Sequence, residues 1–164
     1  MRKIIKAKNI INGIADEVIK DKCIVIEDGL ISEIINFENF KPNDDDVILN
    51  YENEFVMPGM VDVHVHLAFS GITDNRSFRA ESAELDYGEQ ALRGYEFALE
   101  HMSYGFTSLR DMNAPGKVAI NIKNIINKKK LVGPNILACG LGLSVTGGHM
   151  DQPGWSNHVN FTNM

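Results

Sequence analysis

The chain has 164 residues, of which 44% are hydrophobic and 23% are charged, and its formal net charge is −6. This composition is typical of a soluble globular protein, and the negative charge argues against a nucleic-acid-binding surface. No apolar run is long enough to span a membrane, and the first residues lack the apolar core of a signal peptide. We therefore expect a cytoplasmic protein whose partners include neither a nucleic acid nor a membrane.

The first part of the chain predicts short β-strands separated by turns. Asp28 and Gly29 lie between two apolar runs and form a strong two-residue hairpin signal, because both residue types tolerate a positive φ. The acidic stretch 43–46 is predicted to be a solvated loop. The predicted strands cover residues 4–11, 22–26, 30–35 and 47–50.

A turn at Pro58 and Gly59 precedes a strand that carries two histidines to its far end. Side chains two residues apart share a face of a strand, so the pattern places Asp62, His64 and His66 together. Neutral imidazole is a common zinc ligand, and two imidazoles on one rigid strand can reach the same ion. The alternative is a pair of half-buried histidines that only make hydrogen bonds. The opposite face is predicted to pack on another layer, and its residues are Val61, Val63, Val65 and Leu67.

Helices and strands alternate after the histidine pair. A helix is expected over residues 82–102 and a second from Pro115 to about Lys130, because apolar residues recur there at helical spacing. Strands are expected over residues 106–111 and 135–140. Since no hairpin turn joins the strands, the pattern predicts a parallel βαβ arrangement.

Three polar residues follow these strands closely enough to reach the same end of the sheet. Arg110 and Asp111 end the second strand, where they either pair with each other or support the metal ligands from behind; we favour the second role. His149 follows two glycines in the loop after the third strand, and either faces the site or is an ordinary loop residue.

Three stretches of this sequence resemble the metal-dependent amidohydrolase superfamily. Residues 56–66 look like the first barrel strand of that family, with its Pro-Gly turn, its aspartate and its two histidines. Residues 105–111 are similar to the second barrel strand. Residues 143–149 resemble the branch that includes imidazolonepropionase-related enzymes and Xaa-Pro dipeptidases.

The resemblance implies an α/β fold in two parts. Residues 1–56 would form a small β-sandwich-like segment, and residues 57–164 the first three β/α units of a TIM-type (β/α)8 barrel. Such a barrel needs about 250 residues, so we expect the barrel to be incomplete and the chain to be a fragment.

The resemblance also implies a site. His64 and His66 would bind one or two divalent metal ions, with zinc as the expected metal, and His149 would contact the substrate. Asp62, Arg110 and Asp111 would support the ligands. We assign no catalytic residue, because the general acid–base aspartate and the other ligands of the family are expected beyond the chain end.

The expected function is a metal-dependent hydrolase that uses metal-activated water to cleave C–N bonds in a small amide, cyclic amide or dipeptide. We expect the 164-residue chain to be inactive alone. The alternative is a non-catalytic truncated paralogue or a partner subunit. Because three barrel strands leave open sheet edges, we also expect oligomerisation or a complementing chain.

Overall fold

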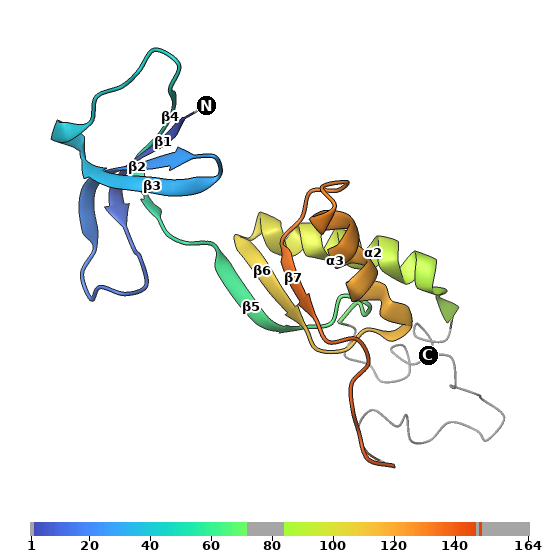
Figure 1. The fold of residues 1–164 in the computed structure, drawn as a ribbon. Helices are drawn as coiled ribbons and strands as arrows, with labels where there is room; N and C mark the ends of the chain where they lie inside the picture. The colour runs from blue at the N-terminus through green and yellow to red at the C-terminus, as the bar shows by residue number, and fades with distance from the viewer. Residues whose placement is uncertain (1, 72–83, 147, 149–164) are drawn as a thin grey trace. The chain divides into compact units, whose positions relative to one another are not determined.

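The computed structural model describes residues 2–71, 84–146 and 148 of a mixed α/β protein. The chain divides into two compact units, Met1–Pro58 and Gly59–Met164 (Figure 1). No helix in the described part of the chain is both long and apolar enough to cross a membrane.

The first unit contains a four-stranded sheet in the order β3-β2-β1-β4. Strand β1 pairs antiparallel with β2 and parallel with β4. All four predicted strands are present, and β2 and β4 are longer than expected. Among the described residues the unit forms one sheet. The bounds are β1 Lys3–Ile10, β2 Ile19–Glu27, β3 Leu30–Asn36 and β4 Val47–Val56, with a short 3-10 helix at Phe37–Asn39.

The turn between β2 and β3 is the hairpin predicted from the sequence. Asp28 has a φ of 52° and Gly29 a φ of 81°. Two consecutive left-handed residues twist the chain in the sense that matches the strands on either side. Strand β2 is buried on both faces of the sheet, because Cys23 and Val25 belong to one apolar cluster and Ile24 to another.

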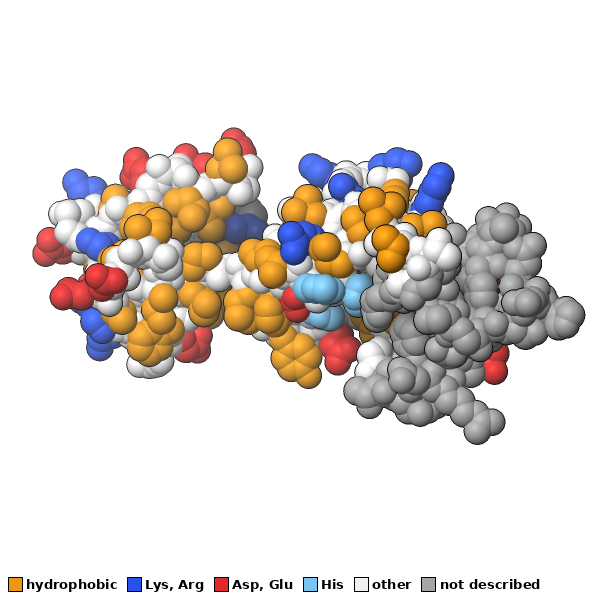
Figure 2. All heavy atoms as spheres, turned by 90° about the horizontal axis from the view of Figure 1, so that it is seen from below, with side chains coloured by type: hydrophobic (Ala, Val, Ile, Leu, Met, Phe, Trp, Pro, Cys, Tyr) orange, Lys and Arg blue, Asp and Glu red, His pale blue; other side chains and the backbone are white. Residues whose placement is uncertain are grey.

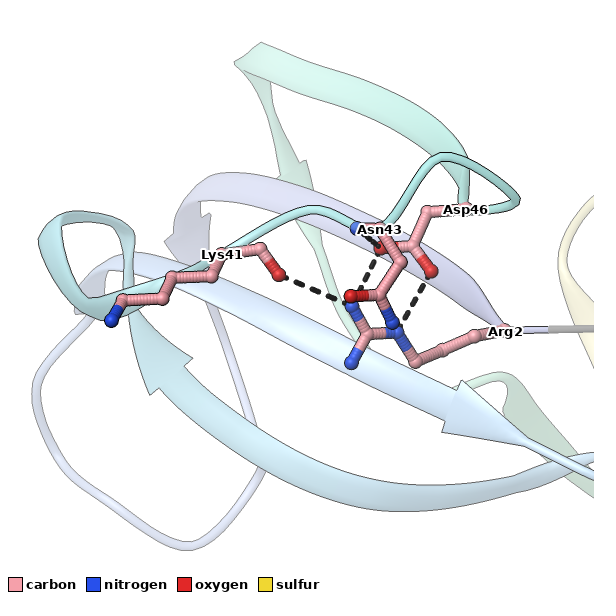
Figure 3. Close-up of polar contacts among 4 residues, drawn as sticks. All are labelled: Arg2, Lys41, Asn43 and Asp46. Atoms are coloured by element: carbon pink, nitrogen blue, oxygen red, sulfur yellow. Dashed lines mark hydrogen bonds and ion pairs between the residues drawn. The ribbon is translucent and has the colours of Figure 1, made fainter.

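An ion pair ties the start of this unit to the loop before β4 (Figure 3). Arg2 Nε donates to Asp46 Oδ1 at 2.8 Å and Arg2 Nη2 donates to Asp46 Oδ2 at 2.6 Å. The main-chain N–H of Asn43 also donates to Asp46 Oδ2, at 2.9 Å. These bonds and the Arg2 charge lower the pKa of Asp46 to about 2, and its side chain is only 2% exposed.

In its described part, the second unit contains three parallel strands in the order β5-β6-β7, with helices α2 and α3 packed on one face of the sheet (Figure 1). This arrangement confirms the predicted parallel βαβ pattern. The bounds are β5 Met60–Val65, α2 Tyr87–Ser103, β6 Phe106–Asp111, a 3-10 turn at Pro115–Lys117, α3 Val118–Asn127 and β7 Asn135–Ala138.

Helix α2 begins at Tyr87, whereas the sequence pattern predicted a helix from residue 82; residues 82 and 83 lie outside the described residues. The side chain of Asp86 accepts a hydrogen bond from the main-chain N–H of Glu89 at 2.9 Å, which satisfies a donor of the first turn and fixes the helix start. The helix ends where expected, since Gly105 has a φ of 90°.

The core of the second unit lies between the sheet and the helices. Each strand contributes a buried apolar side chain, from Val65, Leu109 and Ile136, and these pack with residues of α2 and α3. Leu137, which follows Ile136, is 58% exposed. Side chains alternate along a strand, so within the described part of the chain the opposite face of the sheet is open at β7.

Helix α2 approaches the end of β5 very closely. A Cβ atom at Gly94 would lie 2.6 Å from the main-chain oxygen of Leu67 and 3.0 Å from Ile122 Cδ1. The absence of a side chain at Gly94 therefore lets the helix pack against the segment that directly follows His66.

The Arg2–Asp46 pair predicts an acid-sensitive contribution to stability. The folded-state pKa of Asp46, about 2, lies below its ordinary value of 3.8. The carboxylate therefore stabilises the fold above pH 3.8, and this contribution is lost as the pH falls through about 2. In urea unfolding of the full chain, Asp46→Asn should lower the urea concentration at the unfolding midpoint at neutral pH. The variant should also lack the loss of stability that the wild type shows as Asp46 is protonated in acid.

Glu52→Gln provides the matched control for that experiment. Glu52 pairs with Lys6 at 2.6 Å, but its side chain is 42% exposed, so solvent screens the pair. Its effect on the midpoint should be smaller. Equal midpoint losses in the two variants at every pH would contradict the role given to Asp46.

Candidate metal centre

Strand β5 brings the two predicted histidines side by side at its C-terminal end. The ring centroids of His64 and His66 are 5.1 Å apart, and the ring planes meet at 76°. Both residues are exposed. Figure 2 shows histidine side chains at the surface of the second unit, next to acidic, basic and apolar groups.

A main-chain carbonyl orients the ring of His66. Its Nδ1 lies 3.3 Å from the main-chain oxygen of Asn113, on the segment that follows β6. A carbonyl oxygen can only accept a hydrogen bond, so Nδ1 carries the proton and donates it. In the neutral ring the lone pair then lies on Nε2, which is the nitrogen left to bind a metal.

Two polar side chains hold the peptide group that joins Val63 to His64. The main-chain N–H of His64 donates to Asp62 Oδ1 at 3.1 Å. The pairing of β5 with β6 shifts register between Asp62 and Val65, and Arg110 Nε donates to the Val63 oxygen within this stretch at 2.6 Å. Asp62, from the same strand, and Arg110, from β6, therefore both fix the peptide group before His64.

Asp111 holds the residue that follows His66. Its Oδ2 accepts a hydrogen bond from the main-chain N–H of Leu67 at 2.8 Å. The side chain is fully buried, and its Oδ1 has no hydrogen-bond partner among the described residues. Burial raises the pKa of Asp111, while the bond from Leu67 and the nearby His66 act in the opposite direction.

The alternative that Arg110 and Asp111 pair with each other is wrong. Neighbouring residues of a strand point to opposite faces, and here Arg110 is exposed while Asp111 is buried. Arg110 instead bonds to the Val63 oxygen and Asp111 to the Leu67 N–H.

Sequence reasoning missed Asn113. This residue is 6% exposed, its carbonyl contacts His66, and its side-chain Oδ1 accepts a hydrogen bond from the main-chain N–H of Gly142 at 2.8 Å. No motif marks it. The available signal was its place two residues beyond the end of β6, at the edge where parallel strands gather their functional residues.

The predicted apolar face of β5 is only partly buried. Val65 and Leu67 are 8% and 1% exposed, but Val61 and Val63 are 58% and 57% exposed. Strand β5 lies at the edge of the described sheet, and the described helices pack against its C-terminal end. The expectation that all four residues are buried is therefore wrong for Val61 and Val63.

The described donors fit two positions of a metal site. Two adjacent, exposed imidazoles, one with its Nε2 made available by a carbonyl, match the nitrogen ligands that zinc accepts. Within residues 2–71, 84–146 and 148 no group of three or more His, Cys, Asp or Glu side chains could hold a metal ion. His149 lies outside the described residues.

Comparison with known proteins identifies relatives of this chain. Residues 55–160 match the sequence profile of the amidohydrolase family. Imidazolonepropionase of Picrophilus torridus is 44% identical over 62 residues, which are 38% of this chain and 14% of that protein. Ochratoxinase of Aspergillus niger is 31% identical over 96 residues, which are 58% of this chain and 19% of that protein.

A solved structure has a similar fold. A Xaa-Pro dipeptidase, crystallised with methionine bound in its active site, superposes with a TM-score of 0.80 and 29% sequence identity. The match covers 96% of this chain and 38% of the dipeptidase. The chain therefore spans well under half the length of these relatives.

The Asp111–Leu67 bond predicts a graded response to substitution. Asp111→Ala removes the acceptor of a buried N–H group, which should lower the free energy of unfolding by about 1–3 kcal/mol. Asp111→Asn keeps an oxygen at that position and should cost less. Urea unfolding of both variants measures the difference, and equal losses would show that the hydrogen bond is not what Asp111 contributes.

Proposed function

Because the chain belongs to the amidohydrolase family, we propose that it supplies the first histidine pair of a metal-dependent hydrolase that cleaves C–N bonds. The observation that carries this proposal is the 5.1 Å separation of the His64 and His66 rings at the end of a parallel strand. Family membership and relatives that are hydrolases support a hydrolytic function.

His64 and His66 would bind one or two divalent metal ions. The metal that we propose is zinc. His66 would bind through Nε2, since its Nδ1 is engaged by Asn113. When bound, a divalent metal lowers the pKa of water so that hydroxide is available near neutral pH. Asp62, Arg110 and Asp111 would keep the strand and the segment after it in the geometry that aims both rings.

Zinc in proteins usually takes three or four protein ligands, so His64 and His66 alone would hold the ion weakly and leave it largely hydrated. We propose that the remaining ligands and the general acid–base aspartate lie outside the described residues, in later strands of a (β/α)8 barrel. Residues 57–164 would be the first three β/α units of that barrel, and residues 1–56 a β-sandwich-like segment. The parallel order β5-β6-β7 with helices on one face supports this proposal.

The substrate class we propose is a small amide, cyclic amide or dipeptide. The name of the Xaa-Pro dipeptidase indicates a dipeptide, and that structure matches 96% of this chain. His149 would contact the substrate, because it follows the loop that leaves β7 at the same end of the sheet as His66.

Zinc binding by the purified chain tests the histidine pair. Zn²⁺ affinity, measured by competition with a chromophoric chelator and checked by elemental analysis, should be lost in the His64→Ala, His66→Ala double variant. His101→Ala is the matched control, since His101 lies on α2 and its Nδ1 contacts the Phe97 oxygen at 2.8 Å. Unchanged affinity in the double variant would contradict the proposed ligands.

Activity of the chain alone provides a second test. We expect the purified 164-residue chain not to hydrolyse an Xaa-Pro dipeptide, because its described residues provide too few donors for a catalytic zinc site. Hydrolysis that disappears on chelation and in the double variant would overturn this expectation. A chain that binds no zinc would instead favour the non-catalytic paralogue or partner subunit.

A further inference from the structure

Asn113 is bonded to the candidate site through one atom and to a loop through another. Its main-chain oxygen lies 3.3 Å from His66 Nδ1, and its side-chain Oδ1 accepts from the Gly142 N–H at 2.8 Å. A single buried residue therefore contacts both a proposed metal ligand and the start of the loop that leaves β7.

The backbone around Asn113 is held at both of its neighbours. The N–H of Met112 donates to the Val65 oxygen at 3.0 Å, which extends the pairing with β5. The N–H of Ala114 donates to the Gly140 oxygen at 3.0 Å, on the side of β7. Because the Ala114 N–H and the Asn113 carbonyl belong to one planar peptide group, the second bond also helps to aim that carbonyl at His66.

The side chain of Asn113 anchors this segment through a buried hydrogen bond. A buried amide is costly unless its polar atoms are bonded, and at 6% exposure Asn113 depends on protein partners. The Gly142 N–H satisfies its Oδ1. Losing that bond would leave a buried acceptor without its partner and only the Ala114–Gly140 bond to hold the peptide group, so we expect the carbonyl of residue 113 to shift.

We propose that Asn113 is a positioning residue that couples the ring of His66 to the loop that begins at residue 141. The side-chain bond to Gly142 holds the residue, and the residue's carbonyl holds His66 in the tautomer whose Nε2 is free. This inference deepens the proposed function and rests on it for its catalytic meaning. It identifies a further group on which metal binding depends, besides the two ligands.

A merely structural role for Asn113 makes a different prediction. If the residue only fills space, its replacement would lower stability without changing the hydrogen bonding of His66. The ring ¹⁵N chemical shifts of a histidine report which nitrogen carries the proton. At about pH 8, where histidine rings are ordinarily neutral, these shifts separate the two possibilities.

The test uses the isotopically labelled full chain without metal. The wild type should show His66 protonated on Nδ1. Asn113→Ala should give a mixture of tautomers, whereas Asn113→Asp, which keeps an oxygen at the Oδ1 position, should retain the wild-type pattern. Ile122→Val is the stability control, since Ile122 is a buried core residue of the same unit whose aliphatic side chain makes no hydrogen bond.

A second variant removes the same bond from its other end. Gly142→Pro deletes the N–H donor and leaves Asn113 intact, so it should shift the His66 tautomers in the same direction as Asn113→Ala. The inference is overturned if both variants keep the wild-type shifts, or if Ile122→Val changes them as much.

Zinc affinity separates this inference from the function on which it rests. By chelator competition with Zn²⁺ alone, Asn113→Ala should weaken binding about tenfold relative to the wild type. A wild type that binds no Zn²⁺ would refute the proposed function, while the tautomer shifts would still decide whether Asn113 positions His66.

Discussion

The position of the candidate site depends on hydrogen bonds between the end of β5 and the last residue of β6 with the segment that follows it. The Asp111 carboxylate accepts from the Leu67 N–H, and the Asn113 carbonyl engages His66. The N–H of Met112 also donates to the Val65 oxygen. These contacts leave the residues that carry the imidazoles little freedom to rotate, even though both rings are exposed.

The packing of the second unit directs those contacts to one end of the sheet. Val65, Leu109 and Ile136 are buried with the helices, so each strand has a fixed inner face and a fixed register. Parallel strands then end at the same edge, where their connecting segments meet. The close approach of Gly94 to the Leu67 oxygen extends this packing to the segment that follows His66.

Much of this arrangement follows from local sequence patterns. The Asp28-Gly29 hairpin, the parallel βαβ order and the proximity of His64 to His66 could all be predicted, because each depends on a short-range periodicity or on a turn residue. The same patterns placed Arg110 and Asp111 at the right end of β6. Arg110 and Asp111 have separate partners because neighbouring residues of a strand lie on opposite faces, a consequence that their spacing in the sequence already implies.

Other features depend on contacts between distant segments and could not be predicted. Asn113 contacts His66 and Gly142, which lie 47 and 29 residues away along the chain. The exposure of Val61 and Val63 depends on which described elements reach the outer end of β5, and the alternating pattern carries no information about that. The start of α2 was misplaced because the cap at Asp86 was not recognised.

The central claim is that the two imidazoles at the end of β5 bind one metal ion together. A Zn²⁺ titration followed through the ring ¹⁵N resonances of the histidines tests this claim most directly. We expect the ring ¹⁵N resonances of His64 and His66 to shift together at the same zinc concentration, with the His66 change at Nε2, and those of His101 not to shift. Independent shifts of the two residues, or a response confined to one of them, would contradict this claim.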